Sequence, residues 1–208
     1  MVQTWPVAIS RKDNTILMHN IRVFTSGHSN RKWIDFISIL KENNVDLLVD
    51  VRRYPGSRAY PQFNKEQMTT AVQRENISYV HIEKLGGRRN NKKSDSKGNR
   101  SSDYSDNQNN GWKNKSFRAY ADYVATTAFK EGINELLSLM KKYSNLAIMC
   151  AEAVPWRCHI RMISDYIVMV EGVSVFDTLS FKQQPSPHKV TSFAYLSNDK
   201  ITISYSEM

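Results

Sequence analysis

The sequence predicts an α/β protein of three layers, in which a mainly parallel central sheet carries helices on both faces and a C-terminal β-hairpin follows. Three observations indicate this class. Short apolar runs alternate along the chain with longer segments in which apolar residues recur at helical spacing. Residues 45–51, VDLLVDV, form a nearly continuous apolar run of the kind found in the middle of a parallel sheet. The chain has 208 residues, 40% of them hydrophobic, which suffices for one substantial core.

We expect residues 1–20 to be an N-terminal extension and residues 21–208 to be a single α/β domain. The first predicted strand is 22–25, and the polar stretch SGHS comes directly after it. A helix follows, which Ser29 or Asn30 can cap. Its apolar side chains fall at helical spacing, at Trp33, Phe36, Ile37 and Leu40.

The apolar strand 45–51 ends in a Pro-Gly loop that carries three arginines. A helix at 64–75 and a strand at 77–82 come next. We predict a basic, flexible loop at 86–117, because residues 86–118 hold nine Lys or Arg against three Asp and contain few apolar residues.

The longest predicted helix covers residues 118–142, with its apolar and aromatic side chains on one face. A strand, a helix and another strand complete the alternation, and two short alternating segments about the turn SNDK predict the hairpin. These last elements are placed at 145–149, 156–170, 174–177, 192–196 and 201–205.

Loops that leave the carboxyl ends of parallel strands all open at one edge of the sheet. The predicted strand boundaries therefore bring four polar segments together, at residues 26–29, 52–58, 81–89 and 150–161. The last of these, CAEAVPWRCHIR, holds two thiols, a carboxylate, an imidazole and two guanidinium groups, so we place the chemistry of the protein at this edge.

Composition excludes several classes of protein. No run approaches the roughly 20 apolar residues of a membrane span, and the first residues lack the apolar core of a signal peptide, so we expect a cytoplasmic protein without a membrane partner. Two cysteines in a reducing compartment argue against a disulfide framework. No GxGxxG follows the first strand and no Walker A sequence is present, so we expect no cofactor.

Six motifs occur in one order along the chain: TSGHS (25–29), LVDVRRYPGSR (48–58), YVHIEKLGGRR (79–89), NGWKNKSFRAYADY (110–123), MCAEAVPWRCHIRMISD (149–165) and HKVTSFA (188–194). This set closely resembles the DUF488 family, which is named for an unknown function. The resemblance implies an α/β fold and a polar cleft. The sequence departs from the family at CHIRMISD, where the family has CHRSLIAD, so that Ile160 occupies the arginine position and Arg161 follows one residue later.

Two carboxylates, Asp50 and Glu152, follow central strands and can act as the acid and the base of a hydrolysis, with His28 and His159 to move protons. We predict these four as catalytic residues. The predicted substrate-binding residues can hold a phosphate, hydrogen-bond to it or stack on a base. They are Ser29, Arg52, Arg53, Ser57, Arg58, Tyr79, His81, Arg88, Trp112, Arg118, Cys158 and Arg161. Tyr54 and Trp156 are further candidates for stacking.

The predicted function is therefore an enzyme that hydrolyses nucleic acid or a nucleotide, and a base-excising glycosylase is one form that fits without a cofactor. A non-catalytic nucleic-acid-binding module is the first alternative. In that case the same arginines bind the backbone, and Glu152 and Asp50 only orient them. A purely structural interpretation is also open for each residue, in which Asp50 forms an ion pair with the arginines, Glu152 caps the next helix and His81 is a core histidine. The sequence does not indicate the oligomeric state.

A thiol-dependent enzyme is the second alternative. The predicted helix start places Cys158 near a helix N-terminus beside Arg157, His159 and Arg161, and each of these features lowers a thiol pKa. We predict no metal site, because neighbouring side chains such as Cys158 and His159 diverge on a helix and no CxxC or HExxH spacing is present.

Overall fold

The computed structural model describes residues 21–89 and 109–207. The predicted N-terminal extension, 1–20, and the middle of the predicted basic loop, 90–108, lie outside the described residues. The strands are β1 (Arg22–Gly27), β2 (Leu47–Asp50), β3 (Ser78–His81), β4 (Asn145–Cys150), β5 (Val175–Asp177), β6 (Ser186–Pro187), β7 (Ala194–Leu196) and β8 (Ile203–Tyr205). The helices are α1 (Trp33–Glu42), α2 (Lys65–Gln73), α3 (Lys115–Val124), α4 (Thr127–Met140) and α5 (Ile160–Met169). No helix in these described ranges is long and apolar enough to span a membrane.

The central sheet has the strand order β3-β2-β4-β1-β5-β6, in which the first five strands are parallel and β6 pairs antiparallel with β5. Strands β7 and β8 form a separate antiparallel hairpin. The predicted mainly parallel sheet and C-terminal hairpin are confirmed. Strand β6 was not predicted, because its two residues include a proline and carry no apolar pattern.

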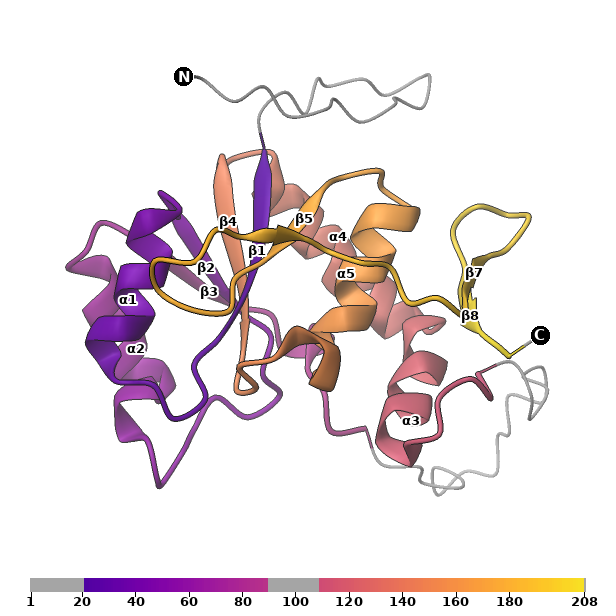
Figure 1. Ribbon diagram of the computed structural model, residues 1–208, viewed down its shortest axis with the longest axis horizontal. Helices are drawn as coiled ribbons and strands as arrows, with labels where there is room; N and C mark the ends of the chain where they lie inside the picture. Colours follow the sequence, from indigo (N-terminus) through magenta and orange to yellow (C-terminus); the bar gives the residue numbers. More distant parts are fainter. Residues whose placement is uncertain (1–20, 90–108, 208) are drawn as a thin grey trace.

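The crossovers explain why helices cover both faces (Figure 1). From β1 to β2 to β3 the chain steps toward one side of the sheet, and from β3 to β4 to β5 it steps back toward the other. Because crossovers between parallel strands are right-handed, this reversal puts α1 and α2 on one face and α3, α4 and α5 on the other. Two core clusters agree with this: one joins α1 and α2 to residues such as Leu48 and Met149, and the other joins α3, α4 and α5 to residues such as Val49 and Ile148.

The predicted long helix 118–142 is two helices, α3 and α4. Thr126 lies between them with an extended backbone, and its hydroxyl accepts the backbone N–H of Phe129 as an N-cap. A Thr side chain can satisfy a free N–H at a helix start, so it ends one helix and begins the next although the apolar period continues. The predicted helix 156–170 also begins later, at Ile160, because residues 155–157 form a separate 3₁₀ turn.

Replacing Thr126 with alanine is expected to lower the free energy of unfolding by about 1 kcal/mol, the usual cost of losing an N-cap. Urea unfolding followed by circular dichroism measures the change. Thr127→Ala is the matched control, since Thr127 is the exposed first residue of α4 and should change the stability by less than about 0.5 kcal/mol. Equal effects of the two substitutions would contradict the capping role.

The C-terminal segment is fastened to the sheet by a buried polar cluster around Asp165 of α5. One carboxylate oxygen accepts the Thr191 backbone N–H and lies 3.0 Å from His188 Nε2; the other accepts the hydroxyls of Thr191 and Tyr205. His188 Nδ1 also lies 3.4 Å from Asp177 Oδ2 at the end of β5. The motif HKVTSFA thus serves, in this structure, to hold the C-terminal segment of the chain against α5 and β5 through one connected polar network.

Candidate functional site at the carboxyl ends of the strands

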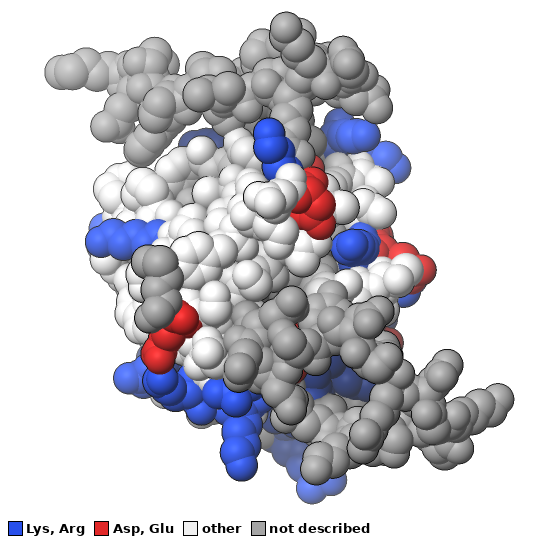
Figure 2. All heavy atoms as spheres, turned by 90° about the vertical axis from the view of Figure 1, so that its right-hand side faces the viewer, with Lys and Arg blue, Asp and Glu red and all other residues white. Residues whose placement is uncertain are grey.

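Four loops leave the carboxyl ends of β1 to β4, at residues 28–32, 51–64, 82–89 and 151–159. Their sequences contain nine Lys or Arg against two Glu, so this edge of the sheet is basic. The strands run downward in Figure 1, and Lys and Arg side chains gather toward the same lower end in the view of Figure 2. The predicted convergence of polar loops at one edge follows from the parallel sheet.

The register of the sheet divides the predicted site between two faces. Asp50 of β2 pairs with Met149 of β4, so Cys150 lies one position further along. Because side chains alternate along a strand, Asp50 and Cys150 point to opposite faces. Asp50 lies on the face of α1 and α2, and Cys150 lies on the face of α3 to α5.

On the first face, Asp50 forms a buried ion pair with Arg52. The guanidinium donates from Nε to Oδ1 at 2.9 Å and from Nη2 to Oδ2 at 2.6 Å, and the backbone N–H of Arg52 also donates to Oδ1. The Tyr79 hydroxyl donates to Oδ2 at 2.7 Å. Burial would lower the pKa of Arg52, but the hydrogen bonds and the charge of Asp50 raise it. This carboxylate is fully engaged by the protein, which favours the structural ion pair over an acid or base role.

His28 completes this network. Its Nδ1 lies 2.9 Å from the Ser29 carbonyl oxygen, which can only accept, so Nδ1 carries the proton and Nε2 accepts from Arg52 Nη1 at 3.2 Å. The ring stacks on Phe63 at 4.4 Å between centroids, and burial lowers the pKa of His28. His28 is therefore held as a neutral ring that positions Arg52.

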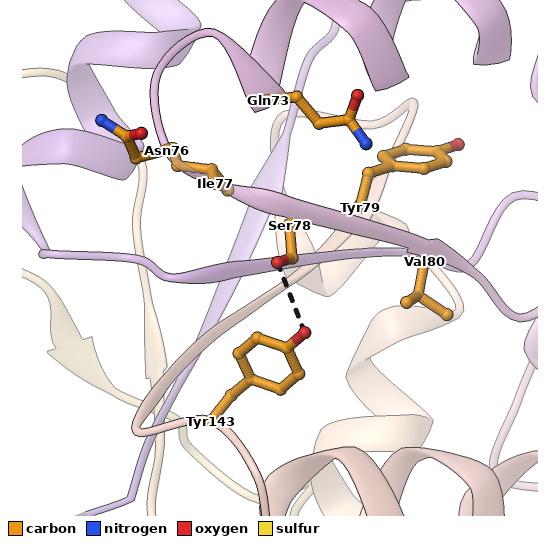
Figure 3. A pocket seen from close by; sticks show the side chains of 7 residues that line it. All are labelled: Gln73, Asn76, Ile77, Ser78, Tyr79, Val80 and Tyr143. Carbon is orange, nitrogen blue, oxygen red and sulfur yellow. Dashed lines mark hydrogen bonds between the residues drawn. The ribbon is translucent and has the colours of Figure 1, made fainter.

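Tyr79 and His81 of β3 support the same network. His81 Nε2 donates to the Arg52 carbonyl oxygen at 2.7 Å, and burial beside Asp50 raises the pKa of Tyr79. The Tyr79 ring also lines a hollow of about 450 Å³ along this edge strand, where the Tyr143 hydroxyl bonds Ser78 (Figure 3). This hollow lies at the side of the sheet, while the reactive groups lie at its carboxyl end.

On the second face, two thiols and an imidazole meet. Cys150 ends β4 and Cys158 precedes α5, and their Sγ atoms lie 2.8 Å apart. His159 Nδ1 lies 3.4 Å from Cys158 Sγ and 3.8 Å from Cys150 Sγ. His159 Nε2 donates to the Val51 carbonyl oxygen at 3.1 Å, which leaves the lone pair of Nδ1 directed at the sulfur atoms.

The two thiols differ in acidity. The hydrogen bond from the Cys158 thiol, together with His159 and the Glu152 backbone N–H, holds the pKa of Cys150 well below its usual range. Burial and the neighbouring Cys150 raise the pKa of Cys158. The second alternative from the sequence has Cys158 as the reactive thiol at a helix start. Helix α5 begins two residues after Cys158, so Cys158 lies outside the helix, and the structure favours Cys150 as the thiolate.

The same three residues can hold a metal ion. Their ligand atoms all lie within 4.8 Å of one another. The sequence argument against a metal assumed that Cys158 and His159 are neighbours on a helix, but Cys158 has an extended backbone with φ −126° and ψ 153°. Their side chains can therefore converge on one point.

Glu152 lies beside this cluster, on the exposed loop after β4. Its carboxylate has no hydrogen-bond or ion-pair partner among residues 21–89 and 109–207, so it does not cap α5. The loop is held close to β1, because a Cβ on Gly27 would overlap the Glu152 carbonyl oxygen. The glycine of the TSGHS motif is thus required by close packing of two backbones.

The predicted anion-binding residues of the loops are more open. Arg58 and Arg88 are exposed and Arg53 is half-buried, with its guanidinium 5.6 Å from the Tyr54 ring. Ser57 shapes its own loop by accepting the Tyr60 backbone N–H, and Ser29 is a turn residue with φ 45°. Three aromatic side chains stand exposed on these loops, Tyr54 at 63%, Trp156 at 51% and Tyr60 at 36%.

Three predicted binding residues lie elsewhere. Trp112 is only 7% exposed and packs on Phe117 and Phe193. Arg118 donates to the Trp112 carbonyl oxygen, and Arg161 donates to Thr191 Oγ1 at 2.7 Å with its guanidinium over the Trp112 ring. Ile160, at the family's arginine position, is buried in the core. These side chains hold α3 and the C-terminal segment together and are not brought to the carboxyl ends of the strands.

Sequence reasoning did not include Cys150 or Arg157 among the site residues. Arg157 is exposed beside Trp156, and only its position in the loop after β4 could have indicated it. Cys150 fits the pattern of a packing residue, since the alternation of apolar residues in β4 places it on a buried face. What identifies it is the proximity of Cys158, which depends on the path of the loop between them.

Comparisons with known proteins add one finding. Neither the curated proteins nor the solved structures contain a match to this chain. A family model described as "Domain of unknown function DUF488" matches residues 32–167, which is more than half of the chain. The chain therefore belongs to the DUF488 family.

Proposed function

We propose that the loops at the carboxyl ends of the strands bind nucleic acid or a nucleotide, and that the protein hydrolyses it with the help of Glu152. The observation that carries this proposal is the composition of those loops, nine Lys or Arg against two Glu, together with the exposed rings of Tyr54 and Trp156. A basic surface with aromatic side chains suits a phosphate backbone whose bases can stack.

The individual arginines differ in their availability. Arg58, Arg88 and Arg157 are exposed and can neutralise phosphates, whereas the guanidinium of Arg52 is occupied by Asp50 and His28. Trp156 and Arg157 are adjacent, so one loop offers both a stacking surface and a positive charge. We assign phosphate binding to the exposed arginines and a supporting role to Arg52.

Of the two carboxylates predicted as acid and base, only Glu152 is available to a substrate, since Asp50 is saturated by hydrogen bonds. A carboxylate without a fixed partner can take a proton from water or give one to a leaving group. Hydrolysis in this protein therefore depends on Glu152 as the general acid or base.

Replacing both Arg58 and Arg157 with alanine is expected to weaken binding of a single-stranded oligonucleotide. The slope of log Kd against log salt should fall by about 0.7 for each phosphate that the variant no longer neutralises. Fluorescence anisotropy at several salt concentrations measures both quantities. Arg74→Ala is the control, because Arg74 is an exposed arginine just before β3, at the opposite end of the sheet. Binding by the unchanged protein that does not respond to salt would contradict the proposal.

Replacing Glu152 with glutamine separates the enzyme from the non-catalytic binding module. An enzyme should lose turnover about 100-fold or more while its affinity stays within about threefold. Turnover is followed by chromatography of labelled oligonucleotide and nucleotide substrates. Glu135→Gln, an exposed position on α4, serves as the control. Binding without turnover in the unchanged protein would leave the binding module as the function.

A further inference from the structure

The cluster of Cys150, Cys158 and His159 has the donor atoms of a zinc site. Two thiolates and one imidazole nitrogen are ligands that Zn²⁺ prefers. Standard Zn–S and Zn–N bonds in a tetrahedron place sulfur and nitrogen ligands about 3.5 Å apart. His159 Nδ1 lies 3.4 Å and 3.8 Å from the two Sγ atoms, so both of these distances already suit an ion.

The distance between the two sulfur atoms must increase before they can bind one zinc ion. Two sulfur ligands of one tetrahedral zinc lie about 3.8 Å apart, and the Sγ atoms here are 2.8 Å apart. The shared thiol proton holds them together, and metal binding displaces that proton. Rotation about the Cα–Cβ bond of either cysteine moves its sulfur atom by more than the required 1 Å or so, with the backbone unchanged.

The surroundings are those of a metal site. The Val51 carbonyl oxygen accepts the His159 Nε2–H, which fixes the tautomer and aims Nδ1 at the sulfur atoms, as an outer-shell partner does for a metal-bound histidine. Backbone N–H groups of Glu152 and Ile160 hydrogen-bond to the Sγ atoms of Cys150 and Cys158 and thereby stabilise negative sulfur. Both cysteines are nearly buried, at 6% and 3% exposed, which protects the ligands from water.

We propose that Cys150, Cys158 and His159 bind one Zn²⁺ ion through Sγ, Sγ and Nδ1. Two thiolates neutralise the ion, so that the cluster can lie at the edge of the core without a net charge. Three protein ligands leave the fourth tetrahedral position to water, the arrangement of catalytic zinc sites. This site stands on the geometry of the cluster and does not depend on the proposed function.

A catalytic role for the water on this ion rests on the proposed function. Glu152 lies on the same loop, two residues after Cys150. The water gives one proton to the Glu152 carboxylate, and its oxygen forms a bond to the substrate while the bond to the leaving group breaks. The leaving group then takes the proton from Glu152, which restores the carboxylate, and a new water replaces the product at the fourth position of the ion. Zinc with two thiolates, an imidazole and a nearby glutamate is the set with which zinc deaminases hydrolyse nucleobases.

Metal binding is tested on the reduced full chain by elemental analysis and by titration with Co²⁺, whose thiolate charge-transfer absorption reports sulfur ligands. The expected result is one ion per chain. Cys158→Ser and His159→Gln should each weaken Zn²⁺ binding by at least about 100-fold, and circular dichroism checks that both variants fold. His81→Gln is the control for loss of a histidine and should bind one ion with unchanged affinity, because its Nε2 donates to a carbonyl oxygen.

A second measurement needs no variant. Bound Zn²⁺ should protect both thiols of the unchanged protein from alkylation, and mass spectrometry counts the modified cysteines. The proposal is overturned if the reduced chain takes up no Zn²⁺, whether or not the isolated protein contains a Cys150–Cys158 disulfide. It is also overturned if Cys158→Ser binds Zn²⁺ with the affinity of the unchanged protein. Glu152→Gln should still bind one Zn²⁺ ion per chain, and complete loss of the ion would overturn the open fourth position, because Glu152 would then be a ligand.

The zinc site and the proposed function fail in different ways. If both hold, a chelator abolishes hydrolysis, leaves oligonucleotide binding intact, and added Zn²⁺ restores turnover. Stoichiometric Zn²⁺ in a protein that hydrolyses no nucleic acid or nucleotide overturns the proposed hydrolysis and retains the site. Hydrolysis that persists after complete removal of metal overturns the role of the bound water.

Discussion

Replacing Asp50 with asparagine is expected to lower the free energy of unfolding by about 3–5 kcal/mol, the cost of leaving a buried charge without its partner. The substitution keeps the shape of the side chain but removes the charge that faces the Arg52 guanidinium. Arg52 is almost fully buried, and its other side-chain partners, the neutral His28 ring and the Met68 sulfur, carry no charge that could replace Asp50. Denaturant unfolding at neutral pH, followed by fluorescence and circular dichroism, measures the loss.

A second variant tests whether the charge is the cause. In Asp50→Asn/Arg52→Met both charges are absent, so the double variant should be more stable than Asp50→Asn alone. Asp35→Asn, at an exposed position in the first turn of α1, should change the stability by less than about 0.5 kcal/mol. A loss at Asp50 no larger than that at Asp35 would contradict the buried ion pair.

Raising the pH from 6 to 9.5 is expected to remove on the order of 3 kcal/mol of stability through His188. Burial alone would lower its pKa, but hydrogen bonds to Asp165 and Asp177 raise the pKa of His188 to about 9. An unfolded histidine titrates near pH 6.5. The contribution is therefore complete below about pH 6.5, where both states are protonated, and is lost as the pH rises through 9.

A comparison of two proteins isolates the contribution of His188. Thermal or urea unfolding of the unchanged protein and of His188→Gln is measured between pH 6 and 9.5. The difference in unfolding free energy between the two proteins should shrink across this range, because the ion pair exists only in the unchanged protein at low pH. A difference that stays constant with pH would show that His188 is neutral between Asp165 and Asp177.

The fold could be predicted from the sequence because burial on both faces gives a strand a run of apolar residues. Leu47 and Leu48 in β2 and Ala147 and Ile148 in β4 show this, because neighbouring residues face opposite sides and all four are buried. The helices show the 3.6-residue period. The division between α3 and α4 could not be predicted from this period, since Thr126 interrupts the backbone while apolar residues continue on one face. The role of His188 also stayed hidden, because its partners lie on two other elements, α5 and β5.

The sequence places the candidate residues at one edge of the sheet, where the parallel strands do bring their loops, but it treats them as a single group. Strand boundaries place Asp50 and Cys150 at carboxyl ends, whereas the face on which each side chain lies depends on the register between β2 and β4. A shift of one residue would put both on the same face, and nothing in either strand alone specifies it. The meeting of Cys150, Cys158 and His159 depends in addition on the 3₁₀ turn at 155–157, which delays the start of α5.

The central position of β1 has a practical consequence for the length of a stable fragment. The family model begins at residue 32, after β1, yet β1 lies between β4 and β5 in the middle of the sheet. It ends at residue 167, before Asp177 and His188, which hold the C-terminal segment. A recombinant fragment cut to 32–167 would keep only β3, β2 and β4 of the central sheet, and it would expose the edge of β4 that pairs with β1 in the whole chain. An unpaired strand edge of this kind favours aggregation. The range that the family model matches is therefore shorter than the part of the chain that folds together. A recombinant protein should include at least residues 21–207.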